Sequence, residues 1–301
     1  MIETGWLWVV FTLIAALAQT ARNAMQRELT AKLGTVGATH VRFLFGFPFA
    51  ILFFVGLIAL TGKTLPQPAL VYWPWLLLGT IAQIIATVLM LAAMGERSFV
   101  VAYAYIKTEP VQVAIFGLVF LGDPLSFPVG IAILIATAGV MAMSVRPGVS
   151  LMSDVRPVLL GVGSGAMLAL SVVGYRGAIL SLELPDFVLA ATFTLVLGLV
   201  MQAAMLSLYL VITDAPVLKA IARAWRPSLF AGFMGALASE FWFLAFALST
   251  AANVRTLGLV ELLFAQFISV FIFGQKTTAR EGVGIVMVVA GVVLLIWAAA
   301  S

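Results

Sequence analysis

Long runs of apolar residues cover almost the whole chain, and only short groups of Gly, Pro and charged residues separate them. A helix that crosses the hydrocarbon core of a membrane needs about 20 apolar residues, because each residue adds about 1.5 Å of length. Barrel strands would instead be short segments in which apolar and polar residues alternate. The pattern therefore predicts an all-α membrane protein with ten transmembrane helices, at residues 6–26, 36–60, 71–94, 98–121, 126–144, 157–180, 187–212, 227–248, 251–273 and 281–299.

The two halves of the chain repeat each other when the sequence is displaced by 152 residues. The shared positions are glycines at equivalent helix ends and packing faces, and one glutamate in the middle of the fourth and ninth predicted helices. Apolar segments align easily, but a shared intramembrane glutamate argues against a chance alignment. The aligned pairs are Glu109 with Glu261, Gly122 with Gly274, Gly130 with Gly282, and Gly139 with Gly291. We therefore predict two five-helix repeats, at residues 1–148 and 149–301.

An odd number of helices in each repeat requires the second repeat to enter the membrane in the opposite orientation. The basic residues agree with such an inverted pair, because twelve Lys and Arg fall on one side of the predicted helices and three fall on the other, with Lys107 inside a helix. The three are Lys63, Arg176 and Arg255. By the positive-inside rule the crowded side faces the cytoplasm, which predicts that both termini face outward.

Composition supports this fold and narrows the chemistry. Of the 301 residues, 63% are hydrophobic and 9% are charged, whereas a soluble domain has about 25% charged residues. The chain has no Cys and one His, His40, which excludes a metal site of several thiolates or imidazoles and a Ser/His catalytic pair. We therefore expect no enzyme activity, no metal and no cofactor. The net charge of +4 is spread over the loops, so we expect no binding of nucleic acid.

Residues 93–140 contain a helix with a central proline, a glycine and an acid at the next turn, and then a glycine-rich helix. Residues 247–295 follow the same order of features without the proline and the acid. These segments resemble the repeated signature of the EamA-type transporters of the drug/metabolite transporter superfamily. Pro110, Gly122, Asp123 and Arg42 match the signature, whereas Leu262 and Gln275 stand where that family favours Pro and Glu. The resemblance covers essentially the whole chain and points to a fold family rather than to a substrate.

The resemblance implies ten helices in two inverted repeats and transport by alternating access. It also implies a central cavity lined by the first, third, fourth, sixth, eighth and ninth helices. Members of the family usually keep both termini in the cytoplasm, which conflicts with the orientation that the basic residues predict.

Glu109 and Glu261 are the first candidate site residues. Glu109 lies eleven residues into its predicted helix, about 17 Å from the start and near the middle of a hydrocarbon core of about 30 Å. A charge at that depth costs about 3 kcal/mol, so it needs a partner or a function. Two interpretations stay open: a carboxylate pair that binds a substrate ammonium or a coupled proton, or ion pairs with Lys107 or Arg255 that brace the helices.

Other candidate residues share these helices. Pro110 removes a backbone donor and disfavours helical geometry at Glu109, so we expect a kink or hinge there. Lys107, Arg255 and Glu240 have no charged counterpart in the other repeat, which suits either recognition of a zwitterion or internal salt bridges. Tyr103 and Trp242 could stack on an aromatic or cationic substrate, or simply pack in the membrane. Arg22 and Arg176 are expected to snorkel to the membrane interface.

These features favour a secondary transporter in a bacterial-type plasma membrane. The substrate is expected to be a small polar or amphoteric metabolite, such as an amino acid. The intramembrane carboxylates make the proton the natural coupling ion. The alternative is a flippase for a lipid-linked carrier, with Arg22, Arg42 and Arg255 as candidates for binding its headgroup. Besides the substrate and the lipid bilayer, we expect no partner, and the protein would be a monomer or a homodimer.

Overall fold

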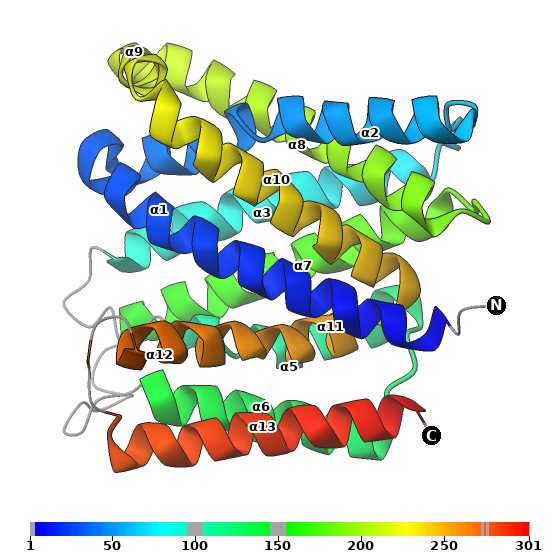
Figure 1. Cartoon of the computed structure of the whole chain (residues 1–301), viewed down its shortest axis with the longest axis vertical. Helices are drawn as coiled ribbons and strands as arrows, with labels where there is room; N and C mark the ends of the chain where they lie inside the picture. Colours follow the sequence, from blue (N-terminus) through cyan, green and yellow to red (C-terminus); the bar gives the residue numbers. More distant parts are fainter. Residues whose placement is uncertain (1–3, 95–104, 145–154, 272–273, 275–276, 301) are drawn as a thin grey trace. The chain divides into compact units, whose positions relative to one another are not determined.

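The structure is a computed structural model of the whole chain, and it describes residues 4–94, 105–144, 155–271, 274 and 277–300. Within these residues all regular structure is helical, so the predicted all-α fold is confirmed (Figure 1). The α-helices are α1 (Leu7–Leu44), α2 (Phe47–Thr61), α3 (Tyr72–Met94), α5 (Glu109–Phe116), α6 (Phe127–Ser144), α7 (Val155–Ser181), α8 (Phe187–Thr213), α9 (Ala215–Arg223), α10 (Trp225–Leu248), α11 (Ala251–Leu257), α12 (Glu261–Phe271) and α13 (Ala279–Ala300). Two short 3-10 helices are η1 (Thr4–Trp6) and η3 (Gly258–Val260), and η2 (Gly117–Leu121) is a short π-helix.

Eight helical segments in the described residues are long and apolar enough to cross a membrane. They are Val36–Thr61, Tyr72–Met90, Phe127–Ser144, Val158–Ser181, Phe187–Thr213, Trp225–Leu248, Ala251–Ile268 and Ala279–Ala299, and each matches one predicted helix. The predicted first and fourth helices correspond to the shorter apolar segments Leu7–Arg22 and Glu109–Leu121, so the count of ten is not confirmed. Residues 98–104 of the fourth lie outside the described residues, and a turn at residues 107–108 separates the rest.

The chain divides into two compact units, and each unit takes segments from both halves of the sequence. The first unit comprises Met1–Val9, Ile81–Gly174 and Ser249–Ser301. Its largest helix contact is between α6 and α13. There a Cβ on Gly139 would lie 2.8 Å from the Gly284 carbonyl oxygen, and one on Gly291 would lie 2.7 Å from the Ala136 nitrogen. The two backbones therefore touch, as small residues allow in membrane helix pairs.

The second unit comprises Val10–Thr80 and Tyr175–Leu248. In its interior α8 packs against both α2 and α10. The ring of Tyr175 fills a space between two glycines, because a Cβ on Gly79 would lie 2.9 Å from the ring and one on Gly198 would lie 3.0 Å from it. Glycine thus makes room for a large buried side chain where three helices meet.

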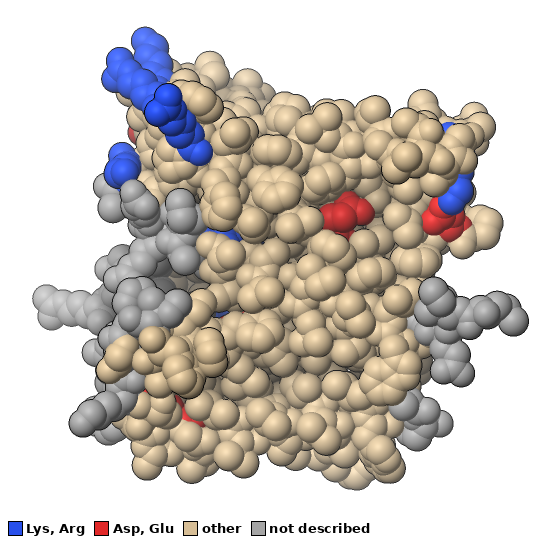
Figure 2. All heavy atoms as spheres, viewed as in Figure 1, with Lys and Arg blue, Asp and Glu red and all other residues tan. Residues whose placement is uncertain are grey.

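Two groups of charged residues in the second unit lie at the two ends of α8. Lys63 forms an ion pair with Asp186, which also caps the start of α8 by accepting from the Val188 and Leu189 backbone N–H groups. At the other end, α9 and the start of α10 expose Lys219, Arg223 and Arg226. Figure 2 shows basic residues gathered where Figure 1 places α9. The division into compact units differs from the predicted repeats 1–148 and 149–301, which remain a statement about the sequence.

Candidate functional site

Glu109 and Glu261 each open a helical segment directly after a break. Lys107 and Thr108 form a turn, and α5 then begins at Glu109 with Pro110 in its first turn. In the second half, α11 ends at Leu257, the short turn η3 follows, and α12 begins at Glu261. The interruption before α5 lies where the sequence predicts a kink at Glu109 and Pro110. Because a helix N-terminus carries partial positive charge, the Glu109 carboxylate lies where the backbone stabilises a negative charge, whereas at Glu261 the helical backbone continues from η3 into α12.

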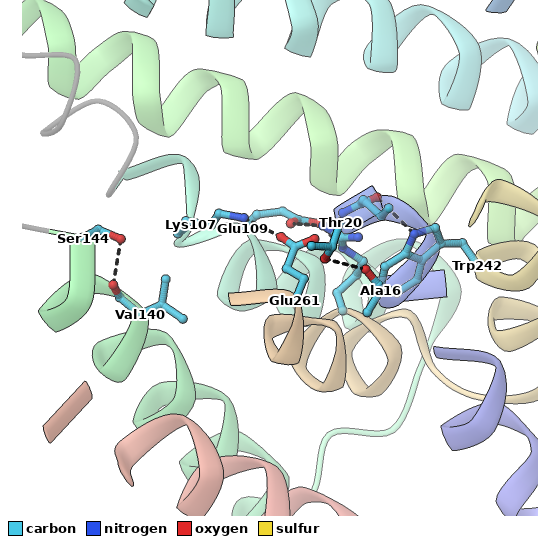
Figure 3. Close-up of polar contacts among 10 residues, drawn as sticks. Ala16, Thr20, Lys107, Glu109, Val140, Ser144, Trp242 and Glu261 are labelled. Atoms are coloured by element: carbon cyan, nitrogen blue, oxygen red, sulfur yellow. Dashed lines mark hydrogen bonds and ion pairs between the residues drawn. The ribbon is translucent and has the colours of Figure 1, made fainter. Parts of the chain in front are cut away.

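Two ion pairs join these breaks, and each pair takes its acid from one half of the chain and its base from the other. Arg255 donates from Nε to Glu109 Oε1 and from Nη2 to Glu109 Oε2, both at 2.7 Å. Lys107 Nζ donates to Glu261 Oε1 at 2.6 Å (Figure 3). Two-pronged Arg–carboxylate contacts are among the strongest charge-assisted hydrogen bonds in proteins. The four residues form a neutral cluster, which we call the crossed ion pairs.

The crossed ion pairs are largely removed from solvent. The Glu109 side chain is 6% exposed and that of Arg255 is 18% exposed, while the values for Lys107 and Glu261 are 15% and 12%. Removing one partner of such a pair costs about 3–5 kcal/mol, because the remaining charge is left buried and uncompensated. In this structure Glu109 and Glu261 therefore form ion pairs with Arg255 and Lys107, as one of the two interpretations of the sequence has it. A ligand can enter the cluster at low cost only if it replaces the contacts that it breaks.

Two further polar residues of the first unit adjoin this site, and sequence reasoning did not select them. Thr108 donates from its hydroxyl to the Tyr105 carbonyl and accepts from Gln112 Nε2 at 3.1 Å. Gln112 Oε1 is buried without a hydrogen-bond partner, and it lies close to Gly165. The signal available in the sequence was the spacing: Gln112 is three residues after Glu109, which places both on one face of α5.

The remaining predicted site residues lie elsewhere. Tyr103 falls outside the described residues. Trp242 belongs to the second unit, where its ring stacks on Phe246 at 6.1 Å and its Nε1 donates to Gln19 Oε1 at 3.2 Å. Glu240 also belongs to the second unit and contacts Thr192. The site that the described residues assemble therefore consists of Lys107, Glu109, Arg255 and Glu261, and the substrate roles of Trp242 and Glu240 stay predictions.

Two arginines occupy positions that the sequence did not predict. Arg22 and Arg176 are 6% and 8% exposed, so both side chains are buried in protein. Arg176 donates to the Phe246 carbonyl of α10, and the Arg22 side chain packs near Gly235 of the same helix. The expectation that they snorkel to the interface is wrong, because helix α10 offers a carbonyl acceptor and a glycine surface within reach of the guanidinium groups.

The apolar helices and the charge cluster buried within one unit define a multi-pass membrane protein with paired intramembrane charges. The comparisons with known proteins specify the class further. No curated protein matches the sequence. A solved crystal structure aligns with a TM-score of 0.74 at 14% identity and covers 97% of both chains, which shows that the fold is shared over nearly the whole length.

Residues 6–145 match the EamA-like transporter family, so this part of the chain belongs to that family. The resemblance to EamA-type transporters of the drug/metabolite transporter superfamily is confirmed over these residues. This match is consistent with an EamA-type membrane transporter of that superfamily.

Proposed function

We propose that the protein is a secondary transporter of a small amphoteric metabolite and that the crossed ion pairs are its substrate site. The observation that carries this proposal is the presence of two acids and two bases in one neutral cluster. An ammonium group alone could replace a base, but it would leave Lys107 or Arg255 buried without its acid. A zwitterion can replace one base and one acid together, so no buried charge loses compensation.

The helix breaks support the same proposal. The turn at residues 107–108 interrupts the helix at membrane depth, where irregular backbone is tolerated only inside protein or beside a water-filled cavity, and η3 tightens the helix before Glu261. Broken helices of this kind form substrate sites in many secondary transporters. Pro110 keeps the N-terminus of α5 from joining the preceding helical turn, and we propose it as the hinge at which that segment tilts.

Gln112 supplies an additional contact for the amine. Its Oε1 is an unused buried acceptor on the same face of α5 as Glu109. A substrate N–H directed to this oxygen would satisfy it without displacing any protein donor, and leaving such a group unsatisfied costs about 1–3 kcal/mol. We propose that Gln112 holds the substrate ammonium next to the Glu109 carboxylate.

A ligand-binding experiment tests the charge requirement. The purified protein is heated in detergent with neutral amino acids, with their amides, which keep only the ammonium, and with their N-acetyl derivatives, which keep only the carboxylate. A bound ligand raises the melting temperature, and above Kd the stabilisation grows with the logarithm of the ligand concentration. We expect stabilisation by zwitterions alone, and equal stabilisation by a singly charged analogue would contradict the proposal.

An assay in proteoliposomes separates transport from lipid flipping. In a flippase the basic side chains would bind an anionic headgroup, but Arg255 is held by Glu109, and Arg22 is buried against α10. In proteoliposomes we expect exchange of radiolabelled neutral amino acids. Movement of a fluorescent lipid-linked phosphate, without amino-acid exchange, would favour the flippase.

A further inference from the structure

A buried acid in the second unit makes no contact with a basic group among the side chains that the structure describes. Glu240 of α10 is 9% exposed, and its Oε1 lies 2.5 Å from Thr192 Oγ1 of α8. Its other oxygen, Oε2, is buried and makes no hydrogen bond. Among the described residues, Thr192 is the hydrogen-bonding side chain that contacts Glu240. This arrangement contrasts with Glu109 and Glu261, each of which accepts from a cation.

The hydrogen bonds of Thr192 determine which atom carries the proton. Thr192 Oγ1 also lies 2.8 Å from the Val188 carbonyl oxygen, one turn earlier in α8. A threonine hydroxyl has one hydrogen, and a carbonyl can only accept. If that hydrogen points to Val188, the short contact to Glu240 requires a proton on the carboxyl group. Both contacts are hydrogen bonds only when Glu240 is the neutral acid.

The elements packed against α10 place their charged groups away from Glu240. α2 has no titratable side chain. On α8 the cap Asp186, which pairs with Lys63, lies six residues or about 9 Å before Thr192, and Tyr209 lies seventeen residues or about 26 Å after it. Arg226 lies at the start of α10, about 21 Å along the helix from Glu240, and Lys219 and Arg223 belong to α9, which precedes α10.

Other basic groups contact α10 at different turns. Arg22 and Arg42 pack beside Gly235, about 7.5 Å along the helix axis before Glu240. Arg176 donates to the Phe246 carbonyl, about 9 Å beyond Glu240, and the Tyr175 ring packs at a tilt against Phe243, with 4.8 Å between the ring centroids. None of these groups forms a hydrogen bond or an ion pair with the Glu240 carboxyl in the described part of the chain.

We propose that Glu240 and Thr192 form a proton-binding site in the second unit, separate from the crossed ion pairs. In this conformation the Glu240 carboxyl group keeps its proton and donates a hydrogen bond to Thr192 Oγ1. When α8 and α10 separate enough to admit water, the carboxyl group releases the proton to water and becomes a carboxylate. A conformational cycle that alternately buries and hydrates this acid would carry one proton. The coupling to substrate rests on the proposed transport function, whereas the proton site itself does not.

Infrared spectroscopy of the purified protein tests the site without any substrate. A protonated carboxylic acid has a carbonyl stretching band that carboxylates lack, and this band shifts in D₂O. We expect such a band at neutral pH in the wild-type protein and its loss in Glu240→Gln. The matched control is Glu183→Gln, since Glu183 is exposed in the loop before α8, and it should leave the band unchanged.

A second variant keeps the proposal testable if Glu240→Gln does not fold. Thr192→Val keeps the side-chain shape but removes the hydroxyl, so the band should remain and move to higher frequency as the acid loses its acceptor. A spectrum without the band at neutral pH, or a band that neither variant alters, would overturn the proposal. Presence of the band in a protein that exchanges no amino acid would leave the proton site standing and refute only the proposed transport of amphoteric metabolites.

Discussion

The pairing of Glu109 with Arg255 predicts that removing one member costs more stability than removing both. Glu109→Leu leaves Lys107, Arg255 and Glu261 in a site with a net charge of +1. Because the Glu109 and Arg255 side chains are 6% and 18% exposed, little water is available to solvate the unpaired guanidinium. Loss of one partner from a buried pair costs about 3–5 kcal/mol, and we expect a value near 3 for Glu109→Leu and for Arg255→Met.

The double variant restores neutrality to the cluster. Apolar residues of similar volume often replace a buried ion pair without loss of stability, because the desolvation cost of both charges disappears. We therefore expect Glu109→Leu with Arg255→Met to be no less stable than either single variant. Lys107 and Glu261 stay paired in this protein, so the remaining cluster is again balanced.

Reversible unfolding in mixed detergent micelles measures these differences as a double-mutant cycle. The exposed Glu183→Leu change serves as the control for loss of a surface acid and should alter the free energy of unfolding by less than about 0.5 kcal/mol. Residues that do not interact give additive effects within about 0.5 kcal/mol. Additive losses for Glu109→Leu and Arg255→Met would refute the reasoning, since they would mean that the two charges do not compensate each other.

Three other predictions concern the packing and the capping of the helices. Gly139→Val should cost more than about 3 kcal/mol or prevent folding, since its Cβ would meet the backbone of α13, whereas Gly130→Ala has open space and should cost less than about 1 kcal/mol by the same unfolding assay. Asp186→Ala should lower stability by about 1 kcal/mol more than Lys63→Ala does, because Asp186 also caps α8 and the Lys63 pair is partly exposed. Trp242→Phe should cost about 1 kcal/mol by losing the hydrogen bond to α1, and its tryptophan fluorescence should fall without a change in helix content by circular dichroism.

The apolar pattern was sufficient for eight of the membrane helices because hydrophobic length determines which segments can cross a bilayer. It was insufficient for the predicted fourth helix, where the break at Lys107 and Thr108 depends on local backbone geometry rather than on hydropathy. Proline at position 110 was the visible signal of that break. The corresponding break before Glu261 has no proline, so only the repeat could have suggested it.

The sequence did not determine which acid pairs with which base inside the membrane, although the spacing along the helix already argued against one pair. Residues two apart on a helix do not face each other, so Lys107 is poorly placed to pair with Glu109. Pairing across the halves satisfies both acids, but it requires α5 and α11 to pack together, which no local pattern reveals. The burial of Arg22 and Arg176 was missed for a similar reason: the acceptor and the glycine surface that receive them belong to α10, far away in the sequence.

The repeat explains why the two ion pairs differ in strength. Displacement by 152 residues reproduces the acids, Glu109 and Glu261, but it aligns Lys107 with Leu259 and Arg255 with Tyr103. The acids therefore follow the symmetry of the two halves, and the bases do not. Arg255 holds Glu109 through two parallel hydrogen bonds. Lys107 instead contacts Glu261 Oε1 through an ammonium group, which is a compact, strongly hydrated charge. For the proposed substrate site we therefore expect a competing ligand to displace the Lys107–Glu261 contact more easily than the two-pronged Arg255–Glu109 contact.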